Sequence, residues 1–220
     1  MEEVLREDFD RIAKQVDLRR FSGKTILVTG SHGFIGSYLV KMFDYLDICD
    51  VHGIDNFIAG KRDSLADVRL DRVFLHDMDI ASEFALSRLK ADYVLHAASI
   101  AAPMFYKQYP LKTIRANVLG TWNVLDWAVK TKPLSAVHFS SSEVYGDPAQ
   151  IPTAEHYWGH ASFTGPRSVY DESKRLSETL CATYHRQHGV PVKVVRPFNI
   201  YGPGGRLDDG RVIPNLMSAL

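Results

Sequence analysis

Tyr170 and Lys174 have the residue types and the spacing of a proton-transfer pair. They are four positions apart in residues 168–188, a stretch of helical composition, so both side chains should lie on one helix face. A phenol is a poor base at neutral pH, and a neighbouring ammonium group lowers its pKa towards the working range. The pair therefore has the chemistry of a base, Tyr170, and a partner, Lys174. Taken alone, this spacing is common on helices, and a solvated helix face is its default interpretation.

A serine-rich segment supplies further groups that transfer protons. Ser141, Ser142 and Glu143 follow directly after residues 136–140, which have the pattern of a buried strand. Ligands of open parallel sheets bind at the carboxyl ends of the strands. There, hydroxyl groups relay a proton, and Glu143 can act as an acid, a base or an orienting group. The alternative is a turn that only caps a helix.

A glycine-rich turn indicates a ligand site. Residues 25–29 have the pattern of a buried strand and lead into Gly30, Gly33 and Gly36, followed by a helix expected over residues 35–45. Because the first two glycines lack side chains, a pyrophosphate can approach backbone N–H groups at the positive end of that helix. The third glycine lets the helix lie close to the sheet. The pattern predicts a dinucleotide site; the alternative is an ordinary turn between a strand and a helix.

An acidic residue ends the next predicted strand. Asp55 closes residues 51–55, where a carboxylate accepts a hydrogen bond from an adenosine ribose 2′-hydroxyl and repels a 2′-phosphate. The sequence therefore favours NAD over NADP as the cofactor. Lys61 and Arg62 lie close enough along the chain to weaken that preference.

Short β-rich segments alternate with helical stretches from Lys24 onward, which is typical of an α/β fold with a doubly wound parallel sheet. Several of these segments are apolar throughout, as expected of strands that helices cover on both faces. The predicted strands are residues 25–29, 51–55, 73–76, 93–97, 136–140 and 192–196, and the predicted helices are residues 35–45, 111–130 and 168–188.

The pattern divides the chain into three parts. Residues 1–21 form an N-terminal segment with an amphipathic helix, because apolar side chains recur at helical spacings over residues 3–18. Residues 22–200 form the predicted dinucleotide-binding domain with the catalytic residues. Residues 201–220 are rich in turns before a helical run from Val212. They predict the start of a substrate-binding domain that is largely absent from the chain.

The composition is that of a soluble globular protein, with 220 residues of which 45% are hydrophobic and 24% charged. The 26 lysines and arginines balance 26 acidic residues, so there is no basic excess for binding nucleic acid or an anionic membrane. Cys49 and Cys181 are too few for a disulfide framework, and the acidic N-terminus is unlike a signal peptide. The most apolar stretch, residues 93–106, is too short to span a bilayer. We therefore expect a cytoplasmic protein.

Together, these motifs resemble the extended short-chain dehydrogenase/reductase family, and within it the NAD-dependent nucleotide-sugar epimerases, dehydratases and decarboxylases. The likeness covers residues from about 22 to the end and is strongest to the UDP-glucuronate decarboxylase group. It implies a Rossmann fold with helices on both faces of the sheet. The residues that carry it are 29–36, 55, 96–98, 117, 140–146, 170–175, 184–189, 196–203 and 209–212.

The resemblance implies roles for individual residues. Tyr170 is the expected base, Lys174 its partner and a ribose ligand, and Ser141 a hydroxyl relay. Ser142 stands where dTDP-glucose 4,6-dehydratases usually carry aspartate, while Glu143 matches a carboxylate of decarboxylases and some dehydratases. The expected cofactor-binding residues are Gly30, Gly33, Phe34, Ile35, Gly36, Asp55, Asn56, Asp77, Met78, His96, Ala97, Ala98, Asn117 and Lys174, with Asp79 and Ile80 as an alternative register at the adenine. The expected substrate-binding residues are Tyr106, Ser141 and Asn199.

The implied chemistry is modification of a nucleotide sugar through a 4-keto intermediate, with NAD as the cofactor. A carboxylate at C5 then permits loss of CO2, as in a UDP-glucuronate decarboxylase. The alternatives are an NDP-hexose 4,6-dehydratase or 4-epimerase, and an inactive dinucleotide-binding fragment. The family also implies a homodimer built around the helix over residues 111–130. We expect no metal site, because His156 and His160 have no evident third ligand.

Overall fold

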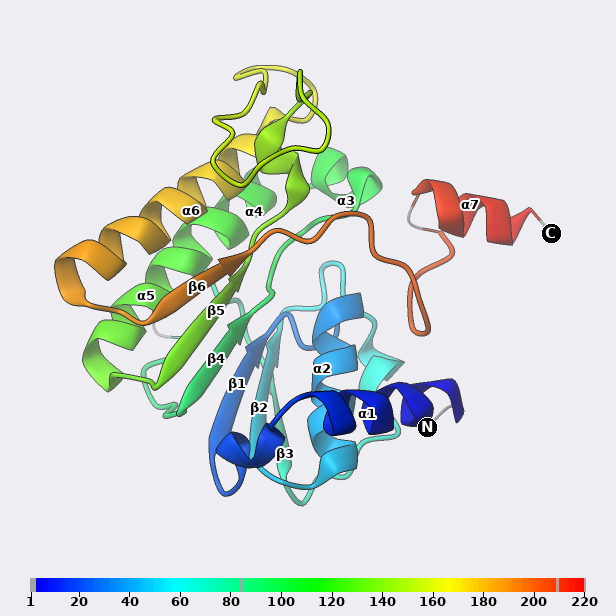
Figure 1. Cartoon of the computed structure of the whole chain (residues 1–220), viewed down its shortest axis with the longest axis vertical. Helices are drawn as coiled ribbons and strands as arrows, with labels where there is room; N and C mark the ends of the chain where they lie inside the picture. Colours follow the sequence, from blue (N-terminus) through cyan, green and yellow to red (C-terminus); the bar gives the residue numbers. More distant parts are fainter. Residues whose placement is uncertain (1–2, 84, 209, 220) are drawn as a thin grey trace.

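The computed structural model describes residues 3–83, 85–208 and 210–219. Asp209, which belongs to one of the motifs above, and Met1 and Glu2 of the acidic N-terminus lie outside the described residues. Six parallel strands form one sheet with helices on both faces (Figure 1). The predicted α/β class and parallel sheet are confirmed.

The sheet has the strand order β3-β2-β1-β4-β5-β6. β1 pairs in parallel with both β2 and β4, so the chain adds strands on one side of β1 and then on the other. In open parallel sheets this reversal leaves a crevice at the carboxyl ends of the strands, beside β1 and β4. The strands are β1 (Thr25–Thr29), β2 (Asp50–Asp55), β3 (Val73–Asp77), β4 (Tyr93–His96), β5 (Ser135–Phe139) and β6 (Val192–Val195).

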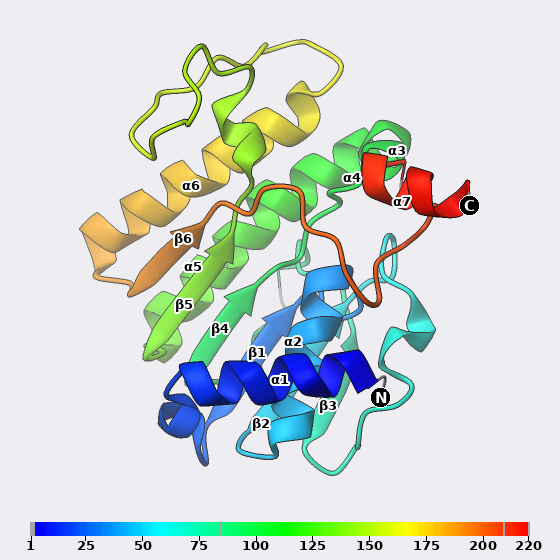
Figure 2. The ribbon, with the colours of Figure 1, turned by 45° about the vertical axis from the view of Figure 1, so that its right-hand side comes forward.

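Two groups of helices cover the sheet (Figures 1 and 2). Successive side chains of a strand point to opposite faces. Accordingly, Ile26 and Val28 belong to the core that contains Phe9, whereas Leu27 belongs to the core that contains Trp127. The first core lies beneath α1 and α2, and the second beneath α5 and α6. The helices are α1 (Glu3–Gln15), α2 (Phe34–Leu46), α3 (Pro103–Gln108), α4 (Pro110–Ile114), α5 (Gly120–Thr131), α6 (Ser168–His188) and α7 (Val212–Ser218).

The helix predicted over residues 111–130 is divided in the structure. Between α4 and α5, Arg115–Leu119 (η3) forms a short π-helix. Such turns are rare and occur frequently at functional sites, and this one carries the fully buried Asn117. The preceding α3 has only six residues, too few for a helical period to show in the sequence.

The N-terminal helix is amphipathic, as predicted, and buries Leu5 and Phe9. The Phe9 ring meets the Tyr38 ring of α2 edge-on, with centroids 5.0 Å apart. Burial of such a side chain contributes roughly 1.5–3 kcal/mol, so α1 stabilises the helix whose first turn borders the site. Within the described part of the chain, no helix has the length and apolar character needed to cross a membrane.

Candidate active site

The glycine turn between β1 and α2 has no room for side chains. Gly30 has φ +70°, and a Cβ there would lie 2.7 Å from the Ala98 Cα at the end of β4. A Cβ on Gly36 would lie 1.9 Å from the Gly30 carbonyl oxygen. Gly33 is the residue before α2 and forms no side-chain cap on the positive end of this helix. This bare backbone cradle fits the pyrophosphate of a dinucleotide.

The carboxylate of Asp55 ties the glycine turn to the end of β2. It is 8% exposed, and one oxygen accepts a hydrogen bond from the His32 N–H at 2.9 Å while the other accepts from the Phe57 N–H at 2.8 Å. The cavity beside it is where we expected the adenosine ribose. Its walls include seven of the expected cofactor-binding residues: Gly30, Gly33, Asp55, Asn56, Met78, Ala97 and Ala98.

Two alternative pairs of residues were expected at the adenine, Asp77 with Met78 or Asp79 with Ile80, and the cavity contains one residue of each pair. Met78 and Ile80 line it, whereas the Asp77 side chain is 62% exposed and forms an ion pair with Arg62 at 3.0 Å. The Arg62 guanidinium also lies over the Phe57 ring, 3.8 Å from its centroid. Arg62, one of the two cations expected to weaken the preference for NAD, is therefore engaged by Asp77 and Phe57.

A second cavity continues from the first and shares Ala97 and Ser99 with it. It brings together groups from β5, α6 and the segment after β6, which are far apart in the sequence. Expected site residues on its walls are Phe34, Ile35, Ala97, Tyr106, Ser141, Ser142, Glu143, Tyr170, Lys174 and Asn199. The predicted base and relay therefore lie beside the predicted dinucleotide cradle.

Lys174 is buried at the base of the second cavity, with 2% of the residue exposed. Its ammonium group donates a hydrogen bond to the Phe139 carbonyl at the end of β5, at 2.6 Å. Burial disfavours the charged form and lowers the pKa of Lys174 to about 8. The nitrogen lies 6.0 Å from the Tyr170 ring centroid.

The pKa of Tyr170 differs from the sequence-based expectation. We expected the Lys174 ammonium to lower it, but burial of the phenol is the largest influence and raises the pKa of Tyr170 above its usual value. Interaction with the side chains of Ser141 and Ser99 acts in the opposite direction and lowers the pKa. The Tyr106 ring stacks on the Tyr170 ring, with centroids 5.4 Å apart, and adds to its burial.

Replacement of Lys174 by methionine should stabilise the fold at pH 7. The pKa of Lys174 is about 8 in the folded protein and about 10.4 in the unfolded chain, so between these pH values the unfolded state binds more protons. The contribution of Lys174 to the free energy of unfolding therefore rises as the pH increases between these two pKa values. Methionine removes the cost of burying the ammonium group but also removes its hydrogen bond to Phe139. We expect the free energy of unfolding of Lys174→Met to exceed that of wild type by about 2 kcal/mol at pH 7, and the difference to shrink towards pH 10.

Urea unfolding of the Lys174→Met variant at pH 7 and 9.5 measures this effect. Lys14→Met, at an exposed position of α1, is the control and should give the same difference from wild type at both pH values. A Lys174→Met variant that is destabilised equally at both pH values would contradict the burial effect.

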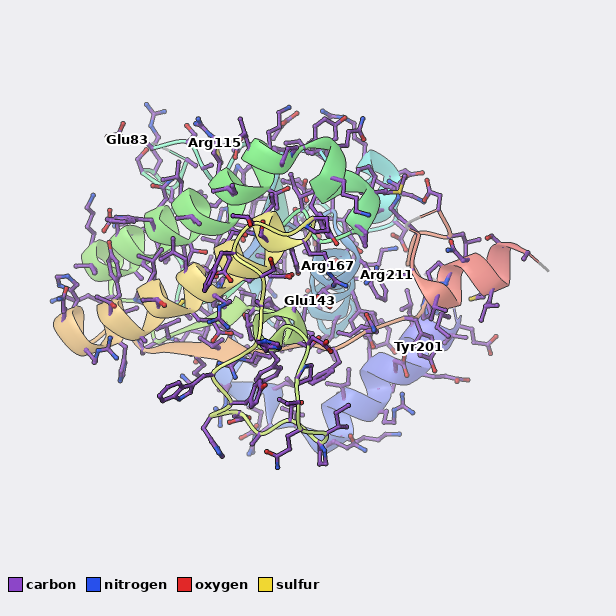
Figure 3. The ribbon with its side chains drawn as sticks, turned by 90° about the horizontal axis from the view of Figure 1, so that it is seen from above. Glu83, Arg115, Glu143, Arg167, Tyr201 and Arg211 are labelled. Atoms are coloured by element: carbon purple, nitrogen blue, oxygen red, sulfur yellow. The ribbon has the colours of Figure 1, made fainter. Side chains whose placement is uncertain are left out.

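Glu143 and Arg167 form an ion pair where the second cavity opens, and Arg211 lies near them (Figure 3). Asp171 is 7% exposed and one of its carboxylate oxygens is buried without a hydrogen-bond partner. Burial, followed by the charge of Glu143, raises the pKa of Asp171 to about 6. Arg167 was not predicted as a site residue, and its signal in the sequence is its position just before the helix predicted over residues 168–188.

His96 and Asn117 are buried beneath the cavity walls rather than exposed on them. The two ring nitrogens of His96 bond to the hydroxyl groups of Thr29 at 2.7 Å and Thr121 at 3.1 Å. The Asn117 amide contacts Ser99 and Ser173. His96 therefore connects β4 to β1 and α5, and Asn117 connects the segment after β4 to α6. The expected contact of these two residues with the cofactor stays a prediction.

A half-buried ion pair contacts the serine-rich segment. Arg196 donates to both carboxylate oxygens of Glu178, at 2.8 and 2.6 Å, and to the Tyr145 hydroxyl at 2.9 Å. Glu178 also accepts a hydrogen bond from the Ser140 hydroxyl at 2.5 Å. Sequence reasoning missed Glu178, although a carboxylate on the face of α6 next to Lys174 was a possible partner for Arg196. Among the described residues, no group of three or more potential metal ligands is present.

The sequence matches a family model over residues 26–220, and that model describes the NAD dependent epimerase/dehydratase family. The chain belongs to this family. The matched region includes both cavities and every expected catalytic residue. NAD is the cofactor of the family, in agreement with the fit of the glycine cradle and Asp55.

The relatives with curated names include UDP-glucuronic acid decarboxylases. The chain is 42% identical over 198 residues to UDP-glucuronic acid decarboxylase 6 of Arabidopsis thaliana, a match that covers 90% of this chain and 57% of that protein. It is 39% identical to UDP-glucuronic acid decarboxylase 1 of Xenopus tropicalis, covering 88% of this chain and 45% of that protein. The chain therefore spans only about half the length of these members of the family.

Solved structures of epimerases and dehydratases have the same fold. The dTDP-glucose 4,6-dehydratase DesIV of Streptomyces venezuelae, solved with NAD and TYD bound, has a TM-score of 0.77 and 31% identity, covering 89% of this chain and 62% of that one. The epimerase Mth375 of Methanothermobacter thermautotrophicus has a TM-score of 0.80 and 27% identity, covering 98% and 61%.

Proposed function

We propose that this member of the epimerase/dehydratase family modifies a nucleotide sugar through a 4-keto intermediate, with UDP-glucuronate decarboxylation as its activity. The observation that carries the proposal is the continuous pair of cavities, in which Tyr170, Ser141 and Glu143 lie next to the glycine cradle. The named decarboxylases that are 38–44% identical to the chain support the choice of reaction.

The residues of the second cavity suit oxidation of a sugar hydroxyl. Bound NAD supplies the hydride acceptor for sugar C4. The Tyr170 phenolate would take the proton of the C4 hydroxyl, and the Ser141 hydroxyl would donate a hydrogen bond to the same oxygen. The buried Lys174 ammonium would contact the cofactor ribose and favour the phenolate by its charge.

Decarboxylation then follows from the chemistry of the 4-keto sugar. A carboxylate on C5 is β to the ketone, so when CO2 leaves, the electrons of the broken bond pass to the C4 oxygen as an enolate. C5 must then receive a proton before the ketone is reduced again. Glu143 lies on the cavity wall with its charge balanced by Arg167, and we assign to it the handling of this proton.

Incubation of the protein with NAD and UDP-glucuronate tests the proposed reaction. We expect CO2 and a UDP-pentose in equal amounts, with no net consumption of NAD. The DesIV likeness favours a 4,6-dehydratase as the second candidate, and some of the other structural neighbours are UDP-sugar 4-epimerases. A 4-keto-6-deoxy product or a C4 epimer from a neutral NDP-hexose, with UDP-glucuronate left intact, would refute decarboxylation.

We also propose a homodimer formed through the outer face of η3, α5 and α6. Leu119, Trp122 and Leu176 are 41%, 46% and 47% exposed there, and apolar surface of this kind is typical of a subunit interface. Light scattering should therefore give twice the mass of one chain, and Trp122→Glu should reduce it to that of a monomer.

The division into parts and the compartment are proposals as well. Residues 201–220 would begin the substrate-binding domain, since Tyr201, Val212 and Leu216 are each more than 60% exposed and a following domain could cover them. Residues 1–21 would support the dinucleotide-binding domain, residues 22–200, through α1. A cytoplasmic location is supported by the two cysteines, Cys49 and Cys181, which are buried free thiols.

A further inference from the structure

Ser99 lies at the junction of the two cavities and belongs to no motif recognised in the sequence. It follows β4 by three positions, at the carboxyl end of the strand beside β1. Ser99 lines both cavities. Ser99, Ser141 and Tyr170 all line the second cavity, and interaction with the side chains of both serines lowers the pKa of the Tyr170 phenol. The two serines come from different strand ends, β4 and β5.

Ser99 also begins a chain of hydrogen bonds that ends at the backbone of Tyr170. The Ser99 hydroxyl donates to the Asn117 side-chain oxygen at 2.7 Å, and the Asn117 amide donates to the Ser173 hydroxyl at 2.8 Å. Ser173 in turn donates to the Tyr170 backbone carbonyl at 3.0 Å. Asn117 and Ser173 are 1% and 4% exposed. One network of hydrogen bonds thus joins the Ser99 hydroxyl to the backbone of Tyr170.

The π-helical turn places Asn117 in this network. Asn117 lies in the middle of η3, and its backbone carbonyl accepts a hydrogen bond from the Thr121 hydroxyl at 2.6 Å. Thr121 also contacts His96 of β4. The Asn117 side chain is hydrogen-bonded to Ser173 and its backbone to Thr121, so the side-chain amide cannot turn freely. Asn117 therefore fixes the position of the Ser99 oxygen.

The two serines differ in the direction of their hydroxyl groups. Ser141 accepts a hydrogen bond from the Glu143 N–H at 3.3 Å, so its own proton is free to point at the phenol. The Ser99 proton points at Asn117, because an amide oxygen only accepts. When Tyr170 loses its proton, rotation of the Ser99 hydroxyl turns that proton towards the phenolate oxygen.

We propose that Ser99 is a positioning residue of the active site, whose hydroxyl group holds the Tyr170 phenol from the β4 side and donates to it when it is ionised. This assignment rests on the proposed role of Tyr170 as the base, but the contact between the two side chains does not depend on that role. Loss of the Ser99 hydroxyl leaves the buried phenolate with the single donor Ser141.

A double-mutant cycle in unfolding tests the contact without substrate or cofactor. Ser99→Ala should destabilise the wild-type protein more than it destabilises Tyr170→Phe, because the phenylalanine ring has no hydroxyl to lose a partner. We expect the two effects on the unfolding constant to differ by about threefold to tenfold. Ser37→Ala, at a buried serine of α2, is the control and should give the same effect in both backgrounds.

The proposal would be overturned if the effects of Ser99→Ala in the two backgrounds differ by no more than the effects of Ser37→Ala. If Ser99→Ala does not fold, Ser99→Cys replaces it in the same cycle, because a thiol keeps the shape and is a much weaker donor. A purely structural role for Ser99 through Asn117 predicts equal destabilisation in both backgrounds, so the cycle separates that role from the proposed one.

The pH dependence of turnover gives a second readout. In Ser99→Ala the pH at which the rate is half-maximal should rise by about 0.5 to 1 unit, since loss of a donor to the phenolate raises the pKa of Tyr170. Ser99→Thr, which restores the hydroxyl, should return the profile towards wild type. An unshifted pH profile in Ser99→Ala would count against the proposal.

A wild-type chain without turnover would refute the proposed function. The unfolding cycle would still decide the role of Ser99, because it needs no turnover.

Discussion

Replacement of Tyr170 by phenylalanine should lower turnover by about a thousandfold and leave NAD affinity within twofold of wild type. General acid–base groups contribute about 100- to 10,000-fold to rates, and the phenolic hydroxyl is the group we assign to the proton of the C4 hydroxyl. The ring itself remains in its stack with Tyr106, with centroids 5.4 Å apart in the wild-type protein, so the cavity should keep its shape. CO2 release and NAD calorimetry measure the two effects.

Tyr184→Phe is the matched control for this experiment. Tyr184 lies on the same helix, is also buried, and donates its hydroxyl to Asp126 away from both cavities. The control should lose stability but keep its turnover. Equal rates for wild type and Tyr170→Phe would exclude the phenol as the base, and the absence of turnover from both would argue that this chain is a dinucleotide-binding fragment without activity.

Replacement of Gly36 by alanine should remove NAD binding. The added Cβ would lie 1.9 Å from the Gly30 carbonyl oxygen and 2.9 Å from the Ser31 Cα, and both are backbone atoms that cannot rotate aside. Overpacking of this kind usually costs about 1–3 kcal/mol, and we expect the upper end of that range. Because the clash moves the glycine turn itself, NAD affinity should fall by at least 100-fold in whatever fraction remains folded.

Gly202→Ala provides the comparison. A Cβ at Gly202 would lie 3.7 Å from the Phe34 ring, an ordinary contact, and we expect normal stability and NAD affinity. Urea unfolding and calorimetry on both variants measure the effects. A Gly36→Ala variant with wild-type stability and wild-type affinity would mean that the turn does not hold the cofactor as described.

The positions of elements with a local pattern could be predicted from the sequence. The strand at Thr25–Thr29 was predicted to the residue, because a buried run of β-rich residues between Lys24 and a glycine admits few alternatives. The glycine turn and Asp55 follow from the same local pattern. Tyr170 and Lys174 line the same cavity, as their spacing of four in one helix predicted, and their roles stay proposals.

Groups that act through tertiary contacts were not found in this way. Ser99 is an ordinary serine until β4 places it beside a phenol contributed by α6. Glu178 and Arg167 have no motif, and their ion-pair partners, Arg196 and Glu143, come from segments after β6 and β5 that are distant in the sequence. The pKa of Tyr170 was expected to fall on the evidence of one neighbouring charge, whereas burial by Tyr106 and the surrounding elements raises it. Desolvation depends on the whole fold, which spacing along the chain does not contain.

Calorimetric titration of the intact, cofactor-stripped protein with NAD and with NADP tests the central claim most directly. The bare glycine cradle and the buried Asp55 carboxylate predict saturable binding of one NAD per chain, at least tenfold tighter than NADP. Absence of measurable affinity for either dinucleotide at millimolar concentration would contradict the account of the site and every catalytic role assigned around it.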